Sequence, residues 1–425
     1  MPPVRIAVLG AGTVGSQVLR LLQESADDFE ARAGAPLEVV GIGVSNLEKE
    51  RDPWVDRSLL TDDLDGLATS ADIVIELIGG ISPARELVLR ALGAGATVVT
   101  GNKALLAAHG PEIFEAAAAS GADLYYEAAV AGAVPIVYAL RESLAGDTVT
   151  RVLGIVNGTT NYILDEMATK GLTFDAALAE AQRLGFAEAD PTADVDGHDA
   201  AAKAALLASL AFHTRVSIDD VPTVGIRDIT AADIELAEAS GYTLKLLAIA
   251  DRMPDGVAVR VSPALVPHGH PLASVHGSFN AIVIEAEAAD RLMFYGRGAG
   301  GAPTASAVLS DVVAGASHKV HGGNAPQESA YAALPVLGPE AVQTAQQIRL
   351  RVADRPGVLA KVAGAFAEHG ISIESVRQLA ADNGDAALSI VTHVARTSEL
   401  SATVAELEAE EMVREVVSVL PVENA

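Results

Sequence analysis

The sequence predicts an α/β protein with three parts: a parallel sheet covered on both faces, an α+β middle part, and a small C-terminal domain of βαββαβ order. Short β-branched runs alternate with alanine-rich helical stretches over residues 1–130, which is typical of a parallel sheet between two helical layers. A second series of apolar runs and helical stretches begins at 346 and is long enough for one small core. The chain has 425 residues, half of them hydrophobic, which suffices for two or three cores.

Each element follows from its own pattern of apolar residues. In the first part we expect strands at 4–10, 36–44, 71–79 and 96–102 and helices at 16–25 and 83–95. In the middle part we expect strands at 151–158, 257–266 and 279–288 and helices at 173–184, 199–213 and 303–316. Two prolines and a glycine at 334–340 indicate a linker. Beyond it we expect strands at 348–353, 371–378, 386–395 and 413–422 and helices at 358–370 and 400–411.

The formal net charge is −27, from 29 basic and 56 acidic residues. Such a surface repels nucleic acid and anionic membranes, so neither is expected as a partner. No run approaches the roughly 18 apolar residues of a membrane span, and the apolar run between Arg5 and Gly10 is too short for a signal peptide. We therefore expect a soluble, cytoplasmic protein. The absence of cysteine excludes disulfides, thiolate metal sites and cysteine nucleophiles.

A glycine-rich turn follows the first predicted strand and opens the first predicted helix. It reads Gly10-Ala11-Gly12-Thr13-Val14-Gly15, which fits the G-x-G-x-x-G pattern of dinucleotide-binding Rossmann domains. The three glycines allow the tight turn, the approach of a pyrophosphate, and close packing of helix on strand. The alternative is a glycine turn in an unrelated α/β domain. The flanking strand and helix favour cofactor binding, because a helix N-terminus supplies amides and partial positive charge.

The residues after the second predicted strand bear on the choice between NAD and NADP. An acidic residue there favours the free ribose hydroxyl of NAD, and an arginine favours the phosphate of NADP. This chain has Ser45 and Asn46, followed by Lys49 and Arg51. The missing acid and the two cations favour NADP, with NAD as the alternative.

A cluster of carboxylates precedes a lysine in a helix otherwise rich in alanine and leucine: Glu188, Asp190, Asp194, Asp196 and Asp199. A calcium loop aligned on Gly197 would need a glutamate at its twelfth position, where Lys203 stands, so a calcium loop is excluded. A solvated acidic loop that caps a helix is one alternative. A surface ion pair between Asp199 and Lys203, four residues apart, is another. A lysine in an apolar helix beside carboxylates fits better with proton transfer to a substrate that carries an ammonium group.

Five segments, in order along the chain, resemble the homoserine dehydrogenase family. EADPTADVDGHDAAAK (188–203) is similar to the family's substrate-site signature, and GIVNGTTNYILDEM (154–167) to its substrate-domain segment. TGNKALLA (100–107) resembles its cofactor-side lysine loop, and YEAAVAGAVPI (126–136) its metal-binding and dimer-contact region. YGRGAGGAPTASAV, near 296, resembles the return to the nucleotide domain. Together these motifs cover most of residues 4–316.

The resemblance implies an NAD(P)-dependent enzyme that interconverts homoserine and aspartate 4-semialdehyde in threonine, methionine and isoleucine biosynthesis. It implies that Lys203 is the catalytic proton donor and that Asp199 is a substrate-binding carboxylate in the catalytic group. Lys103 would lie between nicotinamide and substrate. Glu188 and the backbone of Gly185 would also bind substrate. In the reducing direction of this mechanism, the nicotinamide delivers hydride to the aldehyde carbon C4 and Lys203 protonates the developing alkoxide.

The resemblance also implies further cofactor contacts and a cation site. Gly301 and Ser45 would contact the cofactor, although arginine is common at the position of Ser45 in NADP-preferring members. Glu127 would bind a monovalent cation, usually sodium, together with the carbonyls of Val130, Gly132 and Val134. One carboxylate plus backbone oxygens suits a hard cation of low charge. A capping or ion-pair role is the alternative for Glu127.

Residues 346–425 resemble an ACT domain in element order and in the opening ADRPGVLAKVA (353–363). Arg355, Pro356 and Gly357 form the turn into its first helix, whose amides could take an amino acid's carboxylate. The resemblance implies threonine as effector and a homodimer or homotetramer; a purely structural dimerisation module is the alternative. The expected domains are 1–130 for nucleotide binding, completed by about 303–333, then 131–302 for substrate binding and dimerisation, 334–345 for the linker and 346–425 for the ACT domain.

Two other functions share some of these features. A semialdehyde dehydrogenase would share the cofactor fold, but its thioester chemistry needs a cysteine, so it is excluded. A non-catalytic regulator that binds nucleotide and amino acid remains an alternative, against which Lys203 and its carboxylates argue. The ten histidines scatter, and several lie in stretches that are expected to be loops rich in glycine and proline: His268, His270, His276, His318 and His321. Zinc would require a helix-spaced pair or thiolates, so no zinc is expected.

Overall fold

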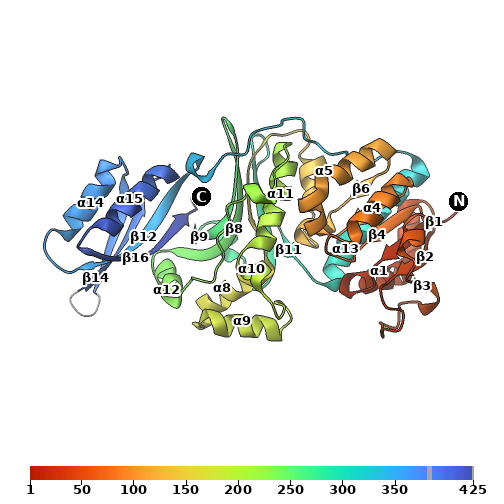
Figure 1. The fold of residues 1–425 in the computed structure, drawn as a ribbon, viewed down its shortest axis with the longest axis horizontal. Helices are drawn as coiled ribbons and strands as arrows, with labels where there is room; N and C mark the ends of the chain where they lie inside the picture. Colours follow the sequence, from red (N-terminus) through yellow and green to blue (C-terminus); the bar gives the residue numbers. More distant parts are fainter. Residues whose placement is uncertain (381–384, 424–425) are drawn as a thin grey trace. The chain divides into compact units, whose positions relative to one another are not determined.

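A computed structural model describes residues 1–380 and 385–423 (Figure 1). The described residues form two compact units, which we treat separately. The first unit combines 1–158, 199–221 and 278–334, and the second combines 159–198, 222–277 and 335–425. Two stretches of the predicted C-terminal domain, 381–384 and 424–425, lie outside the described residues. The domain boundaries given above remain predictions.

The first unit contains a six-stranded parallel sheet. Its strands are β1 (Val4–Leu9), β2 (Leu37–Gly43), β3 (Leu60–Thr61), β4 (Ile73–Glu76), β5 (Thr97–Thr100) and β6 (Leu124–Tyr125). They lie in the order β3-β2-β1-β4-β5-β6, and every neighbouring pair is parallel. This is the strand order of a Rossmann domain, so the predicted parallel sheet is confirmed.

Helices cover this sheet, and one of them comes from far along the chain. They are α1 (Thr13–Glu24), α2 (Ala26–Ala33), α3 (Leu64–Ala68), α4 (Ala84–Gly93), α5 (Lys103–Ser120) and α13 (Gly301–His321). Apolar side chains of α1 and α13, among them Val18 and Val308, pack with Ile6 and Ile73 of the sheet in one buried core. Burial of this shared face joins α13 to the first sheet.

A smaller antiparallel sheet also belongs to the first unit. Its strands are β7 (Val149–Ile155), β10 (Phe279–Ala286) and β11 (Asp290–Arg297), with β10 in the middle. The sequence predicted β7 and β10 but assigned no element to β11, whose side chains alternate between exposed and half-buried. Helix α11 (His198–Phe212) is buried along most of its length. Two short helices, α6 (Ala128–Ala131) and α7 (Ile136–Tyr138), follow β6.

The second unit contains helices and a long antiparallel strand pair. The helices are α8 (Gly158–Lys170), α9 (Phe174–Arg183), α10 (Thr192–Val195) and α12 (Ala231–Ala239), and the strands are β8 (Tyr242–Met253) and β9 (Gly256–Pro267). The sequence assigned no element to β8. Seven consecutive residues of β8, 244–250, are buried, so the strand lacks the alternation that marks a half-buried strand.

The C-terminal part of the second unit has the predicted βαββαβ order. It consists of β12 (Gln343–Ala353), α14 (Val358–Glu368), β13 (Ile373–Ala380), β14 (Asp385–Thr392), α15 (Thr397–Ala409) and β16 (Val413–Val422), with a two-residue strand β15 (Ala395–Arg396). The strands lie in the order β16-β12-β14-β13. Side chains of these strands and of both helices form a separate buried core around Phe366.

This C-terminal part is tied to the rest of its unit. Strand β16 pairs with β9 through Val422 and Leu265, and the buried carboxylate of Asp233 forms an ion pair with Arg349 of β12. In the predicted linker, Leu337 donates a backbone hydrogen bond to Val257. The predicted linker 334–340 therefore contacts the edge of β9.

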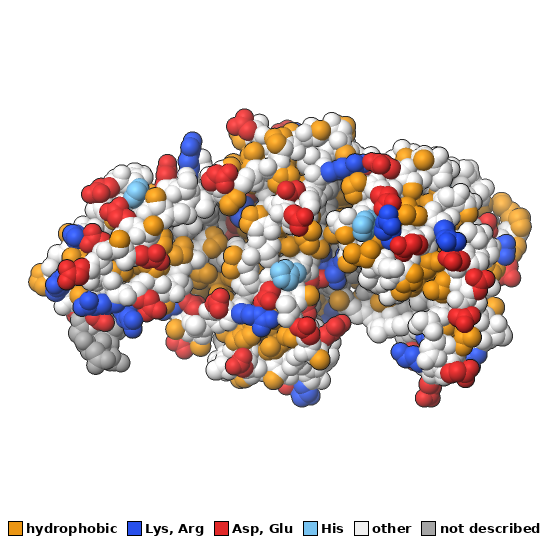
Figure 2. Space-filling model, viewed as in Figure 1, with side chains coloured by type: hydrophobic (Ala, Val, Ile, Leu, Met, Phe, Trp, Pro, Cys, Tyr) orange, Lys and Arg blue, Asp and Glu red, His pale blue; other side chains and the backbone are white. Residues whose placement is uncertain are grey.

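Acidic side chains recur on both units over the face shown in Figure 2, with basic side chains between them. The acidic excess agrees with the net charge of −27. Within residues 1–380 and 385–423, no helix has the length and apolarity needed to cross a membrane.

Candidate active site

The glycine-rich turn lies at the carboxyl end of β1 and leads into α1, as the sequence predicted. A side chain at Gly15 would overlap the carbonyl oxygen of Gly10, so helix and turn pack too closely for any other residue. Gly12 is the N-cap of α1 and faces open space, because no neighbouring atom of the described residues lies within 4 Å of the place that a Cβ would take. The turn therefore presents free surface and helix amides at the edge of the sheet where dinucleotides bind.

A second helix begins beside the first. Gly301 is the first residue of α13, and a Cβ there would lie 2.9 Å from the carbonyl oxygen of Thr13. The two segments are nearly 290 residues apart in sequence, so only the fold brings these helix N-termini together. Both helix termini can contribute partial positive charge to one anionic ligand.

The residues expected to recognise the ribose differ in how firmly the protein holds them. Arg51 donates from Nη1 to the carbonyl oxygen of Ala11 at 2.9 Å and from Nη2 to that of Asn46 at 3.0 Å. Its Nε is buried without a hydrogen-bond partner in the described part of the chain. Ser45 and the Lys49 side chain are exposed. Of the two nearby cations, Arg51 is therefore the one held against the glycine-rich turn.

Two lysines from different helices share the carboxylate of Asp199. Lys103 Nζ, at the start of α5, lies 2.6 Å from Asp199 Oδ1. Lys203 Nζ, one turn along α11 from Asp199, lies 2.9 Å from Oδ2, to which Asn157 also donates at 3.0 Å. Lys203 donates a second hydrogen bond to the carbonyl oxygen of Val156 at 2.7 Å. The structure thus brings together all three residues predicted to be catalytic.

The burial of this cluster excludes the surface ion pair considered above. The side chains of Asp199 and Lys203 are 8% and 9% exposed, whereas that of Lys103 is 42% exposed. Burial opposes ionisation of Asp199, but the charges and hydrogen bonds of Lys203 and Lys103 outweigh it and lower the pKa of that carboxyl below its usual value. Asp199 is therefore an anion that stabilises positive charge on two lysines.

A buried carboxylate near this cluster was not predicted from the sequence. Glu76, the last residue of β4, is fully buried and accepts hydrogen bonds from Ile78, Gly79 and Thr100. A glutamate that ends an apolar strand before two glycines was the available signal in the sequence. Asn102 lies beside it and is the N-cap of α5, the helix that begins with Lys103.

The remaining substrate-binding candidates lie in the second unit, whereas the lysines lie in the first. Gly185 follows α9 and has a positive φ of 78°. Glu188 is exposed, and its carbonyl oxygen accepts a hydrogen bond of 3.0 Å from Gln182. Each of these two residues therefore occupies an exposed segment between α9 and α10.

The carboxylate of Glu127 is buried at the start of α6, and its two oxygens accept hydrogen bonds from the backbone N–H groups of Val137 and Tyr138 at 2.9 and 2.8 Å. Both donors belong to α7, so the Glu127 side chain caps the start of α7 and not of its own helix. Burial raises the pKa of Glu127, and these backbone bonds oppose the rise. Asp311, also buried, accepts from the Glu127 N–H and has an oxygen without a described partner. Neither carboxylate forms an ion pair within residues 1–380 and 385–423, so a cation of low charge fits their chemistry.

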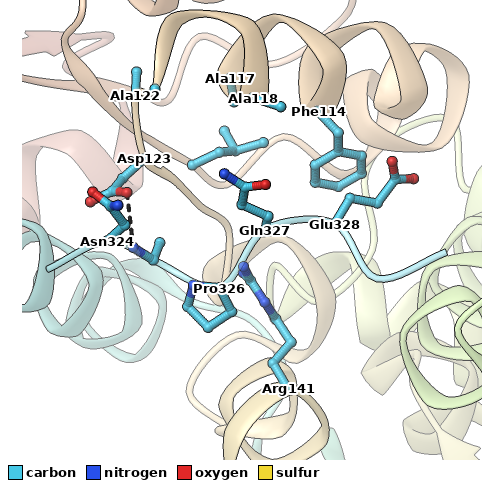
Figure 3. A pocket seen from close by; sticks show the side chains of 13 residues that line it. Phe114, Ala117, Ala118, Ala122, Asp123, Arg141, Asn324, Pro326, Gln327 and Glu328 are labelled. Carbon is cyan, nitrogen blue, oxygen red and sulfur yellow. Dashed lines mark hydrogen bonds between the residues drawn. The ribbon is translucent and has the colours of Figure 1, made fainter. Parts of the chain in front are cut away.

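Two hollows in the first unit contain none of the predicted site residues. Figure 3 shows one of about 50 Å³, lined by Phe114 of α5, by Arg141 and by the segment 324–328, which Asp123 holds through the N–H of Ala325. A larger hollow of about 240 Å³ adjoins it and is also lined by Leu206 of α11. The candidate active site is therefore defined by its side chains and glycine-rich turn, not by these hollows.

The predicted effector turn lies at the start of α14. Arg355 and Pro356 are exposed, and Gly357 is the N-cap of α14 with a positive φ of 92°. Within the described part of the chain, no group of three or more His, Cys, Asp or Glu side chains converges as a metal site would require.

A Rossmann sheet with its glycine-rich turn, and a buried lysine–carboxylate pair that a second, half-exposed lysine joins, define a nicotinamide-dependent oxidoreductase. Family models agree: "Homoserine dehydrogenase, NAD binding domain" matches residues 10–127, "Homoserine dehydrogenase" matches 135–313 and "ACT domain" matches 346–411. The chain is 56% identical to the homoserine dehydrogenase of Corynebacterium glutamicum, over 99% of this chain and 96% of that one. It therefore belongs to the homoserine dehydrogenase family.

Solved structures support the same assignment. A crystal structure of a homoserine dehydrogenase from Thiobacillus denitrificans matches with a TM-score of 0.94 at 40% identity, over 100% of this chain and 99% of that one. A hyperthermophilic archaeal homoserine dehydrogenase in complex with NADPH matches with a TM-score of 0.64 at 27% identity, over 76% of this chain and 99% of that one. The predicted enzyme class, Rossmann domain and ACT domain are confirmed.

Proposed function

We propose that this chain interconverts homoserine and aspartate 4-semialdehyde through the cluster of Lys103, Asp199 and Lys203. The shared carboxylate of Asp199, 2.6 and 2.9 Å from the two lysines, is the observation that supports these roles. When bound, the nicotinamide cofactor supplies or accepts the hydride. The protein's own task is to hold the substrate and to move one proton at its oxygen.

Lys203 performs that proton transfer. Its ammonium has three donors, of which two are used by Asp199 and Val156 in the described structure, so the third is available to a substrate oxygen. In the reducing direction, Lys203 donates this proton to the alkoxide that forms at C4. In the oxidising direction, neutral Lys203 takes the hydroxyl proton. Asp199 stabilises the charged lysine in both directions, and Lys103 lies on the opposite side of the same carboxylate.

Substrate binding requires groups for the ammonium and carboxylate of homoserine. We assign the ammonium to Glu188, because its exposed side chain is a carboxylate without an ion-pair partner among the described residues. Gly185 contributes backbone beside it. Asp199 contributes less directly to substrate binding, because both of its oxygens already accept hydrogen bonds from lysine or asparagine side chains.

We propose NADP as the preferred cofactor. Arg51 is fixed against the carbonyl oxygens of Ala11 and Asn46, and the residues directly after β2, Val44, Ser45 and Asn46, include no acidic side chain to accept a ribose hydroxyl. An Arg51→Gln variant should lower the kcat/KM for NADP by roughly 10-fold while changing that for NAD by less than about 3-fold. An equal loss with both cofactors would contradict this role.

We also propose a monovalent cation, such as sodium, at Glu127. The carbonyls of Val130, Gly132 and Val134 follow within one short segment and would complete an oxygen ligand set. The cation would offset the buried charge of Glu127 beside Asp311. Thermal unfolding in sodium chloride against tetramethylammonium chloride tests it: the parent should be more stable with sodium, and Glu127→Gln should lose the difference.

The ACT domain is proposed to bind threonine at the turn formed by Arg355, Pro356 and Gly357. Exposed amides at the start of α14 suit the carboxylate of a free amino acid. Effector sites of this kind lie between two copies, so we propose a homodimer or homotetramer.

The decisive experiment follows absorbance of the reduced nicotinamide with homoserine and each cofactor in turn. We expect turnover, faster with NADP. Binding of nucleotide and amino acid without turnover would support the non-catalytic regulator instead.

A further inference from the structure

Glu76 is a charged residue in a place where stability alone favours an apolar one. It ends β4, is fully buried, and pairs across the sheet with Thr100 of β5. No basic side chain within residues 1–380 and 385–423 forms an ion pair with it. Burying a carboxylate without a cation is costly, and replacement by an apolar residue of similar size is often neutral or stabilising. The position of Glu76 therefore calls for a reason other than stability.

Hydrogen bonds from two loops satisfy this carboxylate. Oε1 accepts from the backbone N–H groups of Ile78 at 2.8 Å and Gly79 at 3.2 Å, which fixes the loop after β4. Oε2 accepts from the hydroxyl of Thr100 at 2.6 Å, and this same hydroxyl accepts from the N–H of Asn102 at 3.0 Å, which fixes the loop after β5. Both loops leave the carboxyl ends of their strands, where the cofactor binds in this fold.

Asn102 connects the two loops to the catalytic helix. Its Nδ2 donates to the carbonyl oxygen of Gly80 at 2.6 Å and makes a longer contact of 3.5 Å to Glu76. Its Oδ1 accepts from the N–H of Leu105 at 3.1 Å and so caps α5. The next residue is Lys103, whose Nζ reaches Asp199. A continuous chain of contacts therefore leads from Glu76 to the shared carboxylate.

We propose that Glu76 and Asn102 are positioning residues that hold the start of α5, and with it Lys103, in the geometry required for hydride transfer. The loop after β4 is held by the same carboxylate, so one buried group sets both the lysine and the cofactor-side wall of the site. This inference rests on the proposed reaction. Reaction rates are sensitive to such placement, because a displacement of about 1 Å costs on the order of 100-fold.

The test is Glu76→Gln, which keeps the size of the side chain and removes its charge. Aspartate 4-semialdehyde is reduced with cofactor deuterated at the nicotinamide C4, using the epimer whose deuterium appears in homoserine. We expect kcat to fall by roughly 10- to 100-fold and the deuterium isotope effect on kcat to rise above the parent's, because hydride transfer becomes the slow step. A merely structural role would reduce the amount of folded enzyme and leave the isotope effect unchanged.

Asp123→Asn is the matched control. Asp123 is also a largely buried carboxylate of the first unit and accepts a backbone hydrogen bond of 2.8 Å from Ala325, but it holds the segment after α13 (Figure 3). We expect this variant to retain the parent's kcat and isotope effect.

If Glu76→Gln does not fold, Asn102→Ser takes its place, since serine keeps the helix cap but loses the donor to Gly80. It should raise the isotope effect in the same way. A folded variant with the parent's kcat and isotope effect would overturn the positioning role, as would failure of both variants to fold. A parent enzyme that does not turn over would instead overturn the proposed function.

Discussion

Lys203 Nζ lies 2.9 Å from Asp199 Oδ2, and both side chains are less than one-tenth exposed. Their spacing of one helical turn is common on protein surfaces, where such pairs contribute little. Here the pair is buried and Lys103 approaches the same carboxylate from another helix. A buried charge cluster of this kind favours a catalytic role over a structural one.

Replacing Lys203 by alanine should lower kcat by roughly 100- to 10,000-fold, because the variant lacks the group that protonates the substrate oxygen. Cofactor affinity, measured by fluorescence titration with NADPH, should stay nearly unchanged. Lys170→Ala is the control, since Lys170 also forms an ion pair at i,i+4, with Glu166, but is 59% exposed. Activity of Lys203→Ala within about threefold of the parent would refute the assignment.

Glu188→Gln should raise the KM for homoserine by roughly 10-fold, because it removes a charge that faces the substrate ammonium and keeps the shape of the side chain. Glu180→Gln, on the neighbouring helix α9 and paired with Arg183, should change it little. The measurement is a set of initial rates against homoserine at saturating cofactor. A collapse of cofactor binding with homoserine binding intact would mean that Glu188 serves the cofactor and not the substrate.

Removal of residues 341–425 should abolish inhibition by threonine and lower the melting temperature. The deletion takes away β16, which pairs with β9, and leaves the buried carboxylate of Asp233 without Arg349. Loss of one partner of a buried ion pair costs about 3–5 kcal/mol.

Because truncation combines these two effects, Gly357→Ala in the full chain is the cleaner variant. The φ of Gly357 is 92°, so alanine strains the turn while the contacts of Arg349 persist. We expect activity without threonine inhibition. An active variant that threonine still inhibits would place the effector elsewhere.

The stability of the protein should depend on Lys245 at alkaline pH. This side chain is 1% exposed and donates to the carbonyl oxygen of Val275 at 2.6 Å. Burial lowers the pKa of Lys245 to about 8, against opposing effects of Asp165 and Glu238. Between that value and the 10.5 of an unfolded lysine, the unfolded chain binds more protons, so stability rises with pH.

The measurement is urea unfolding of the parent and of Lys245→Met at pH 7 and pH 10. The unfolding free energy of the parent minus that of Lys245→Met should increase by up to about 3 kcal/mol from pH 7 to pH 10. Effects of pH that are common to both proteins cancel in this difference. A difference that does not change with pH would show that Lys245 titrates normally.

The sequence by itself determined the parts that depend on local pattern. Runs such as 4–10 and 96–102 contain parallel strands because continuous apolar residues must be buried on both faces. The turn at Gly10–Gly15 was predictable because a positive φ at Gly10 and close packing at Gly15 require glycine at these two positions. The βαββαβ order of the tail followed in the same way. Resemblance then supplied the roles of Lys103 and Lys203, which composition and spacing alone left open.

The tertiary structure decided what depends on contacts distant in sequence. Spacing placed Lys203 beside Asp199, but it could not show that the pair is buried or that Lys103, about a hundred residues earlier, shares the carboxylate. Spacing also could not show that Glu76 and Asn102 connect the loop after β4 to the start of α5. Strand β8 escaped detection because its run of leucine and alanine, 244–250, contains only one β-branched residue, and periodicity alone does not distinguish such a run from a buried helix. Burial and long-range hydrogen bonding are properties of the packed chain, and the chemistry of this site depends on both.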